Sequence, residues 1–502
     1  MVYLRVFFMR SGIVNIAAKQ AMIKKRIFIL FLISLLLADT GYSFLQHYHT
    51  PFDGDMAGGI VPGDNVKPVL ESPLGLKFFK EHVAYANPNR FFCHWSFYQY
   101  FNRAPFVFQK IVRPISAAYM SCAFAKTVIQ VTILFFLAFF VAGRFLEFEF
   151  WLAALFIAPL FQTNGYRGYM GIIDPSTTYV FFYALPAILL LLYFAPLLLN
   201  YFYNFDLKRL KYIQYLWIPL ALVSSLSGPL NPGVSLVVCL MVFGYCFIRN
   251  FRNSNEKGIF TRLKYAMRNI PGKYYFYLIP LSFFSAYSLF LGHFNIADLT
   301  NDIPLTVLYS RLPQGIYYPL TQKIGYPLLL GILALNTLII YYRLRTPEGQ
   351  KILNAFKWVG LFALIYIVLL PLGGYRYYRP YIIRYDTIIP ITLCLMFIFG
   401  KTTLFILSNL SKIQRYAYLP VILLVMYIFT NADKPEFEKN ECERSSLMQI
   451  SQSPAPVVKL KTNCTVVSWG PVGSPQESAL QAALLMRWGI IKEDKRFYQE
   501  KE

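Results

Sequence analysis

Long apolar runs recur along the whole chain and are separated by short polar connections. Each run is close to the roughly 20 residues that a helix needs to cross a bilayer. Apolar residues within a run are continuous and do not alternate with polar ones, which favours helices over barrel strands. The pattern therefore predicts an all-α polytopic membrane protein with about eleven transmembrane helices. We expect these helices near residues 25–45, 118–142, 150–163, 178–199, 212–227, 234–248, 274–291, 326–342, 358–372, 387–400 and 416–431.

Basic residues gather in every second connection. Residues 208–211, 249–273, 343–357 and 401–415 each hold three or more lysines and arginines, whereas GPLNPG, residues 228–233, holds none. Because basic loops stay in the cytoplasm, the N-terminus is expected in the cytoplasm and the C-terminal tail outside. The outer face then receives the long connections 46–117, 164–177, 292–325 and 373–386.

Three parts of the chain are expected. Residues 1–22 form an N-terminal extension, because Met22 followed by three basic residues is a more natural start. Residues 23–431 form the transmembrane domain with its large first outer loop. Residues 432–502 form a small α/β outer domain, with a strand pair or a single long strand in 457–470. A helix follows, with Ser474 as its N-cap, Pro475 at its first position, Glu477 closing a capping box and Gly489 as the stop.

The two cysteines of this tail, Cys442 and Cys464, are candidates for a disulfide in an oxidising compartment.

Composition narrows the class of protein further. The 502 residues are 56% hydrophobic and 18% aromatic, which excludes an ordinary soluble enzyme. The net charge of +23 is spread over short connections and does not form one basic face, so a nucleic-acid partner is not expected. Membrane lipids are the expected surroundings.

The first outer loop opens with HYHTPFDGDMAGG, residues 47–59. Its polar side chains are His47, His49, Asp53 and Asp55, and three interpretations compete. They form a solvated loop, or they bind a divalent cation such as Mg²⁺ or Mn²⁺. Alternatively, Asp53 or Asp55 is a catalytic carboxylate, since a carboxylate close to lipid loses hydration and becomes a better base.

A second cluster, GGYRYYRPYIIRYD, lies at residues 373–386. Arg376, Arg379 and Arg384 fall on the outer side, where the positive-inside rule disfavours them, so an anionic ligand is expected to offset their charge. Guanidinium groups bind phosphate through a fork of donors, and Tyr385 adds a hydroxyl donor. The alternative is that the arginines extend to ordinary phospholipid headgroups.

In that second cluster, Asp386 could instead be a structural partner of an arginine such as Arg384.

Two further outer loops hold secondary candidates. Asp174 with Arg167 occurs in NGYRGYMGIIDPST, although Asp-Pro-Ser also suits a turn or a helix cap. His293, Asp302 and Arg311 occur in the loop at 292–325, and long outer loops are often functional.

This arrangement resembles the GT-C superfamily of integral-membrane glycosyltransferases: a first helix from the cytoplasm, an outer loop that opens with acidic residues, further helices and a small outer domain. The resemblance implies transfer of a sugar from a polyprenyl-phosphate donor to a glycan, lipid or protein acceptor, with an expected location in the bacterial inner membrane. It implies that Asp53 or Asp55 is the general base and that Arg376, Arg379 and Arg384 bind the donor phosphate. No cofactor is implied beyond the divalent metal considered above.

Two other functions remain open. An O-antigen polymerase or ligase would also use outer arginines and a polyprenyl pyrophosphate substrate. A lipid or solute transporter would place ionisable residues inside the helices and would use broken helices. The apolar runs hold few charges, Asp39 being the main exception identified from the sequence.

Overall fold

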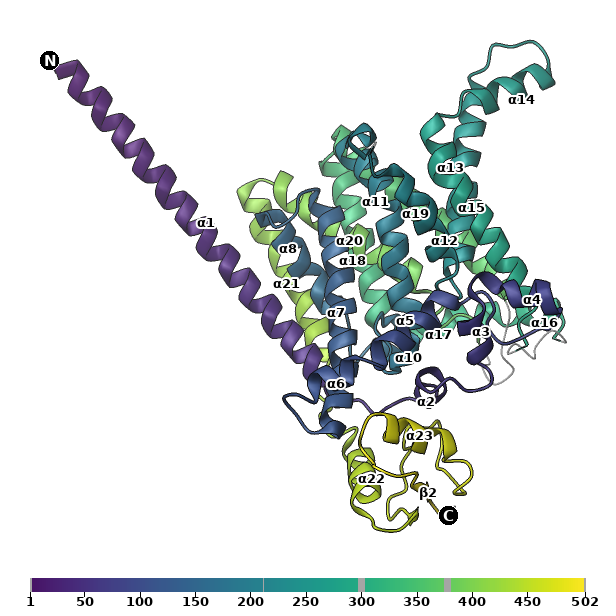
Figure 1. Ribbon diagram of the computed structural model, residues 1–502. Coiled ribbons are helices and arrows are strands. Elements are labelled where there is room, and N and C mark those ends of the chain that lie inside the picture. Colours follow the sequence, from purple (N-terminus) through teal and green to yellow (C-terminus); the bar gives the residue numbers. More distant parts are fainter. Residues whose placement is uncertain (1, 211, 297–302, 374–380, 501–502) are drawn as a thin grey trace.

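A computed structural model describes residues 2–210, 212–296, 303–373 and 381–500. Among them, nine helices are long and apolar enough to cross a membrane, which confirms an all-α polytopic membrane protein. Figure 1 shows these helices side by side in one bundle, with the N-terminal half of α1 projecting away from it. The nine helices are α1 (Val2–Tyr48, apolar from Met22), α7 (Pro114–Ala142), α10 to α11 (Thr177–Tyr203), α13 (Asn231–Arg252), α15 (Gly272–His293), α18 (Gly325–Arg343), α19 (Pro347–Leu369), α20 (Ile389–Asn409) and α21 (Lys412–Ala432).

The other two predicted helices are short. Residues 150–163 give α8 (Phe148–Ile157) and the 3₁₀ turn η2 (Ala158–Leu160), and residues 212–227 give η5 (Gln214–Leu216) and α12 (Trp217–Ser225). Pro159 lies in η2, directly after the end of α8. Proline lacks the N–H that an α-helix needs, so the α-helix does not continue through it. Residues 148–162 nevertheless contact two of the long helices. Phe148 contacts Phe28 of α1, and Gln162 donates to the carbonyl of Phe429 near the end of α21.

Helix α20 is the most buried of the long helices, with α7, α8, α18 and α19 packed around it. It carries Lys401, whose side chain is 7% exposed and donates to Tyr203 Oη at 2.9 Å and to the carbonyl of Val141 at 3.2 Å. These contacts connect Lys401, inside the C-terminal half of α20, to the ends of α7 and α11.

The first outer loop is a set of short helices and not an open chain. It contains α2 (Met56–Ile60), α3 (Lys67–Glu71), η1 (Pro73–Gly75), α4 (Leu76–Glu81), α5 (Phe91–Phe101) and α6 (Ala104–Phe108). In α5, Phe97 and Phe101 are fully buried. The Phe78 ring of α4 stacks on Phe294, the residue that follows α15. The loop therefore covers one end of the bundle. The remaining short elements are α9 (Arg167–Met170), the π-helical turn η3 (Val180–Ala184), η4 (Leu207–Leu210), α14 (Ile259–Arg268), α16 (Leu305–Ser310), α17 (Leu312–Thr321) and η6 (Leu370–Gly373).

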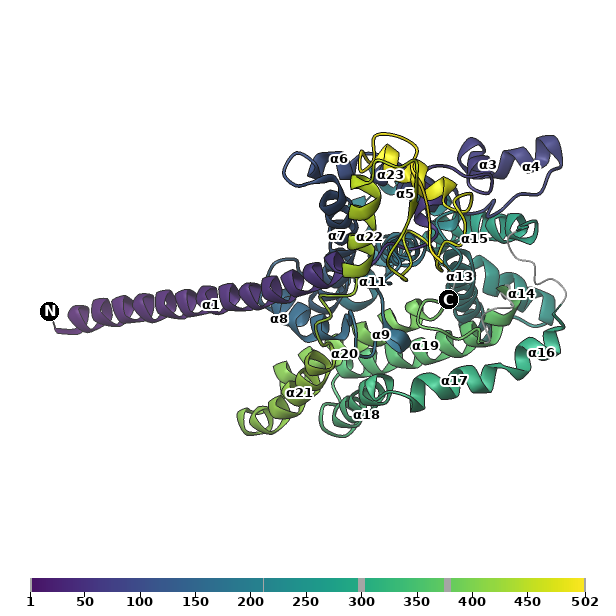
Figure 2. The ribbon, with the colours of Figure 1, turned by 90° about the horizontal axis from the view of Figure 1, so that it is seen from below.

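The chain ends in a small α/β unit that hangs below the bundle in Figure 1 and lies over its end in Figure 2. It contains α22 (Glu441–Gln452), β1 (Val457–Lys459), α23 (Ala479–Arg487) and β2 (Arg496–Tyr498), with β1 and β2 parallel and Val458 opposite Phe497. The predicted strand in 457–470 is therefore only three residues long, and its partner strand was not expected.

Three details of this unit correct or confirm the sequence analysis. Helix α23 begins at Ala479 and not at the expected Pro475, although the expected N-cap, Ser474, does contact Glu477 through Oγ and Oε1 at 3.2 Å. Gly489 adopts φ +66° just after the helix, as its expected role as the stop requires. Cys442 and Cys464 form a disulfide with Cα atoms 6.2 Å apart.

The C-terminal unit shares one hydrophobic core with the first outer loop. Trp488 is fully buried and donates through Nε1 to the carbonyl of Phe101. Glu443, 2% exposed, accepts hydrogen bonds from the N–H groups of Phe52 and Val467 and from Tyr119 Oη. This carboxylate joins the first loop, α7 and the C-terminal unit, so the unit is fixed against the end of the bundle.

Candidate functional site

Asp53 is held against the start of a membrane helix. Its carboxylate accepts from Thr178 Oγ1 at 2.7 Å and from the Thr178 N–H at 3.0 Å, and the residue is 4% exposed. Thr178 lies in α10, the first turn of the long helix that ends at Tyr203. A carboxylate at this position satisfies an otherwise unpaired N–H and complements the positive end of the helix dipole. The observed contacts therefore give Asp53 a structural task.

Asp55 points to a different partner. It is exposed, and its Oδ1 accepts a hydrogen bond from Trp469 Nε1 at 3.1 Å. Between the two aspartates, a Cβ added at Gly54 would lie 2.5 Å from Trp469 Cδ1 and 2.6 Å from the Trp469 backbone nitrogen. The close approach of Trp469, in the C-terminal unit, thus requires a glycine between the two aspartates.

The four side chains considered for a metal do not come together. His47 Nε2 lies 3.2 Å from Gln130 Oε1, and the His49 ring contacts the rings of Tyr48 and Phe437. Across the described ranges no group of three or more histidine, cysteine, aspartate or glutamate side chains could hold a metal ion. The structure does not support a metal site formed by His47, His49, Asp53 and Asp55.

Asp174 is linked to the arginine-rich loop. Tyr385 Oη donates to Asp174 Oδ2 at 2.6 Å, and the Ser176 N–H donates to Oδ1 at 2.7 Å. Burial raises the pKa of Asp174 to about 6, although these two hydrogen bonds lower it. Sequence analysis proposed Asp174 and Tyr385 for separate loops, and the structure joins them.

Arg384 forms a bidentate ion pair with Asp386, with Nε 2.9 Å from Oδ1 and Nη2 2.8 Å from Oδ2. This is the structural pairing considered from the sequence. The Arg384 side chain remains 24% exposed, so the ion pair is not fully buried. Arg376 and Arg379 lie outside the described residues.

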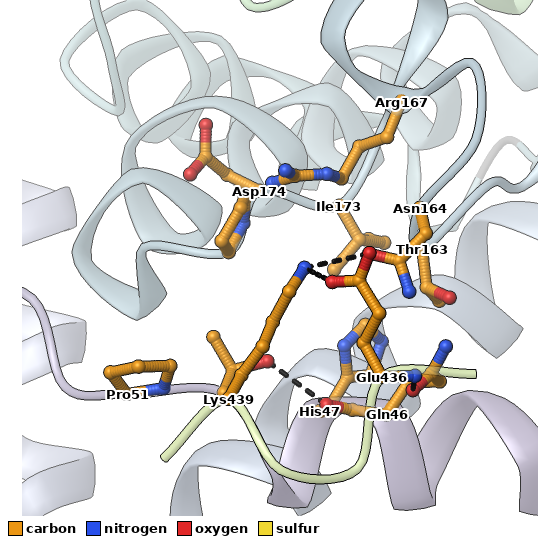
Figure 3. A pocket seen from close by; sticks show the side chains of 12 residues that line it. Gln46, His47, Pro51, Thr163, Asn164, Arg167, Ile173, Asp174, Glu436 and Lys439 are labelled. Carbon is orange, nitrogen blue, oxygen red and sulfur yellow. Dashed lines mark hydrogen bonds and ion pairs between the residues drawn. The ribbon is translucent and has the colours of Figure 1, made fainter. Parts of the chain in front are cut away.

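A cavity of about 90 Å³ opens beside Asp174, at the end of α1. Figure 3 shows Arg167 and Asp174 on one side of it and Glu436, Lys439 and His47 on the other. Lys439 is paired with Glu436 and donates to Asn164 Oδ1 at 2.9 Å. Arg167 is different: its Nε is buried and has no hydrogen-bond partner among the described residues. The full lining is Gln46, His47, Thr50, Pro51, Thr163, Asn164, Arg167, Ile173, Asp174, Pro175, Glu436 and Lys439.

Lys126 was missed by the sequence analysis. It lies within α7, is fully buried, and donates through Nζ to the carbonyl of Pro175, one residue from Asp174. A lone lysine inside an apolar run, SCAFAKTVIQ, was the available signal, because membrane-embedded charges are rarely without function. Glu443 was also missed, since nothing in its polar surroundings in the sequence predicts burial.

The two described candidates of the 292–325 loop lie at the ends of other helices. His293 ends α15, and Arg311 lies between α16 and α17. Neither lines the cavity. Asp302 lies outside the described residues.

The chain was compared with protein-family models, with curated proteins and with solved structures, and none of them matches it.

Proposed function

We propose that the protein is a membrane glycosyltransferase that moves a sugar from a polyprenyl-phosphate donor to an acceptor hydroxyl on the outer face of the membrane. One observation carries the proposal. A single cavity holds a buried carboxyl group with a raised pKa, Asp174, and a guanidinium whose Nε is unpartnered, Arg167. Such a pair supplies a base and an anion-binding group within one small space.

Asp174 is the preferred general base. A pKa of about 6 leaves it ionised at neutral pH and still basic enough to accept the proton of an acceptor hydroxyl. The hydroxyl oxygen attacks the anomeric carbon, and the bond from that carbon to the phosphate oxygen breaks. The phosphate keeps the electron pair, and Arg167 stabilises the added charge. Arg384 is the described member of the arginine loop proposed to contact the same phosphate.

The aspartates of the first loop take other roles in this proposal. Asp53 is a positioning residue, because its carboxylate caps the start of α10 through Thr178 and does not line the cavity. Asp55, which is exposed, is the second candidate for the base. The disulfide between Cys442 and Cys464 supports an outer location of the C-terminal unit, since disulfides persist in oxidising compartments.

The test is transfer of labelled sugar from polyprenyl-phosphate donors by purified protein in lipid. Asp174→Asn should lower the transfer rate by about 10²- to 10⁴-fold, the usual contribution of a general base. Because only the ionised carboxylate accepts a proton, the wild-type rate should fall as the pH drops through about 6. Asp64→Asn, the same substitution at an exposed aspartate of the first outer loop, is the control and should be fully active.

Two outcomes would contradict this assignment. Full activity of Asp174→Asn together with loss in Asp55→Asn would move the base to Asp55. Absence of transfer by the wild type from every polyprenyl-phosphate donor tested would refute the transferase proposal itself.

A transporter is the second candidate, and Lys126 favours it. A fully buried lysine inside a membrane helix, beside the loop of Asp174, is typical of ion-coupled transporters. The helix that starts at Thr177 also contains the π-helical turn η3, an irregularity common at functional sites. Lys126→Met separates the two functions: substrate flux into vesicles without a glycosyl product, lost in this variant, would support transport.

A further inference from the structure

At the far end of the bundle, away from the C-terminal unit, α14 connects the ends of α13 and α15 and projects from the other helices (Figure 1). One face of α14 is fixed to α13. Ala266 is fully buried, Asn250 Nδ2 donates to its carbonyl at 3.1 Å, and Arg262 Nη2 donates to the carbonyl of Phe251 at 3.0 Å. The helix therefore has a defined orientation, and its other faces can be assigned.

An uncovered apolar stripe runs along α14. Ile259, Leu263 and Met267 are spaced by four residues, so they lie on one face, and they are 64%, 36% and 58% exposed. Phe260, beside this stripe, is 83% exposed. A stripe of this kind on a short helix next to membrane-spanning segments is typical of a helix that lies in the membrane surface.

The charge around this stripe has one sign. Residues 249–273 hold seven lysines and arginines and one acidic residue, Glu256. Lys264 and Arg268, both exposed, follow the stripe at a spacing of four residues. With Leu263, Met267 and Tyr275 they line an open groove of about 600 Å³ between α14 and the start of α15, here called the α14 groove.

We propose that the α14 groove binds an anionic phospholipid of the membrane leaflet on this side. An acyl chain packs against Leu263 and Met267, and the phosphate pairs with Lys264 and Arg268. Charge complementarity selects this occupant, because an anionic leaflet attracts basic segments next to membrane helices. This inference is independent of the proposed glycosyltransferase function, since it concerns the opposite end of the molecule.

The test uses the full-length protein in nanodiscs of phosphatidylcholine with phosphatidylglycerol. Lipids that stay bound after release into detergent are counted by native mass spectrometry. The test variant is Phe260→Ser with Lys264→Gln. The matched control is Ile413→Ser with Lys412→Gln, at the start of α21, where Ile413 is also 83% exposed.

The wild type should retain phosphatidylglycerol in preference to phosphatidylcholine. The test variant should bind it at least about fivefold more weakly, the effect of removing one cation from an anionic surface, whereas the control should bind it as the wild type does. Equal retention by both variants would overturn the proposal, as would equal retention of the two lipids by the wild type. A dimer in the wild type that is lost in the test variant would assign the groove to a second copy of the chain instead.

Discussion

Substitution of Gly54 by alanine should undock the C-terminal unit from the first outer loop. The added Cβ would lie 2.5 Å from Trp469 Cδ1 and 2.6 Å from the Trp469 backbone nitrogen, whereas ordinary contacts begin at 3.4 Å. The indole can rotate away, but a backbone atom cannot, so the loop or the whole unit must shift. Overpacking of this kind costs about 1–3 kcal/mol. A loss of about 2 kcal/mol lowers the ratio of docked to undocked unit roughly 30-fold.

The assay is equilibrium unfolding in micelles, followed by tryptophan fluorescence, because Trp488 is fully buried at this interface. Gly58→Ala, four residues along the same loop, is the control: its Cβ would meet only Leu480 Cδ2 at 3.6 Å, an ordinary contact. Gly54→Ala should unfold about 1–3 kcal/mol more easily than this control. Equal stability of the two variants would refute the claim that close packing against Trp469 explains the glycine in DGD.

Two further predictions concern the same unit. Reduction of the disulfide between Cys442 and Cys464, which are 22 positions apart, should lower the free energy of unfolding by about 3 kcal/mol, since the bond restricts the unfolded chain. If dithiothreitol leaves the unfolding midpoint of the wild type unchanged, this prediction is wrong. Glu443→Ala leaves three donors without their acceptor and should cost about 3 kcal/mol or more. Glu441→Ala, exposed on the same helix, should change the free energy of unfolding little, and a similar loss in both variants would argue against the bridging role of Glu443.

The long helices could be predicted from the sequence alone because their signal is local. A segment that lies in lipid must be continuously apolar and must satisfy its own backbone hydrogen bonds, so length and hydropathy suffice to find it. Nine of the eleven expected helices have the required length and composition in the part of the chain that the structure describes. Hydropathy could not distinguish the two short segments from the long helices, since α8 and α12 are as apolar as the long helices. The difference is the position at which the helix ends.

Single side chains of the site were identified by residue type, but their partners were not. Asp53, Asp174 and Tyr385 were all candidates, yet no local pattern indicates that Asp53 contacts Thr178 or that Tyr385 donates to Asp174, 211 positions away. A pattern based on neighbouring residues cannot register such contacts, because they depend on how the helices pack.

The sequence by itself thus determined the class of the protein, its main helices, its charge asymmetry and a short list of polar residues in the outer loops. Only the tertiary structure decided which of these residues share a cavity. It also showed that Lys126 is buried beside the Asp174 loop. Glu443, in the C-terminal unit, accepts a hydrogen bond from Phe52 of the first loop, 391 positions earlier. Hydrophobic burial acts on each segment separately, whereas a site requires several segments to present polar groups to one another within hydrogen-bond distance.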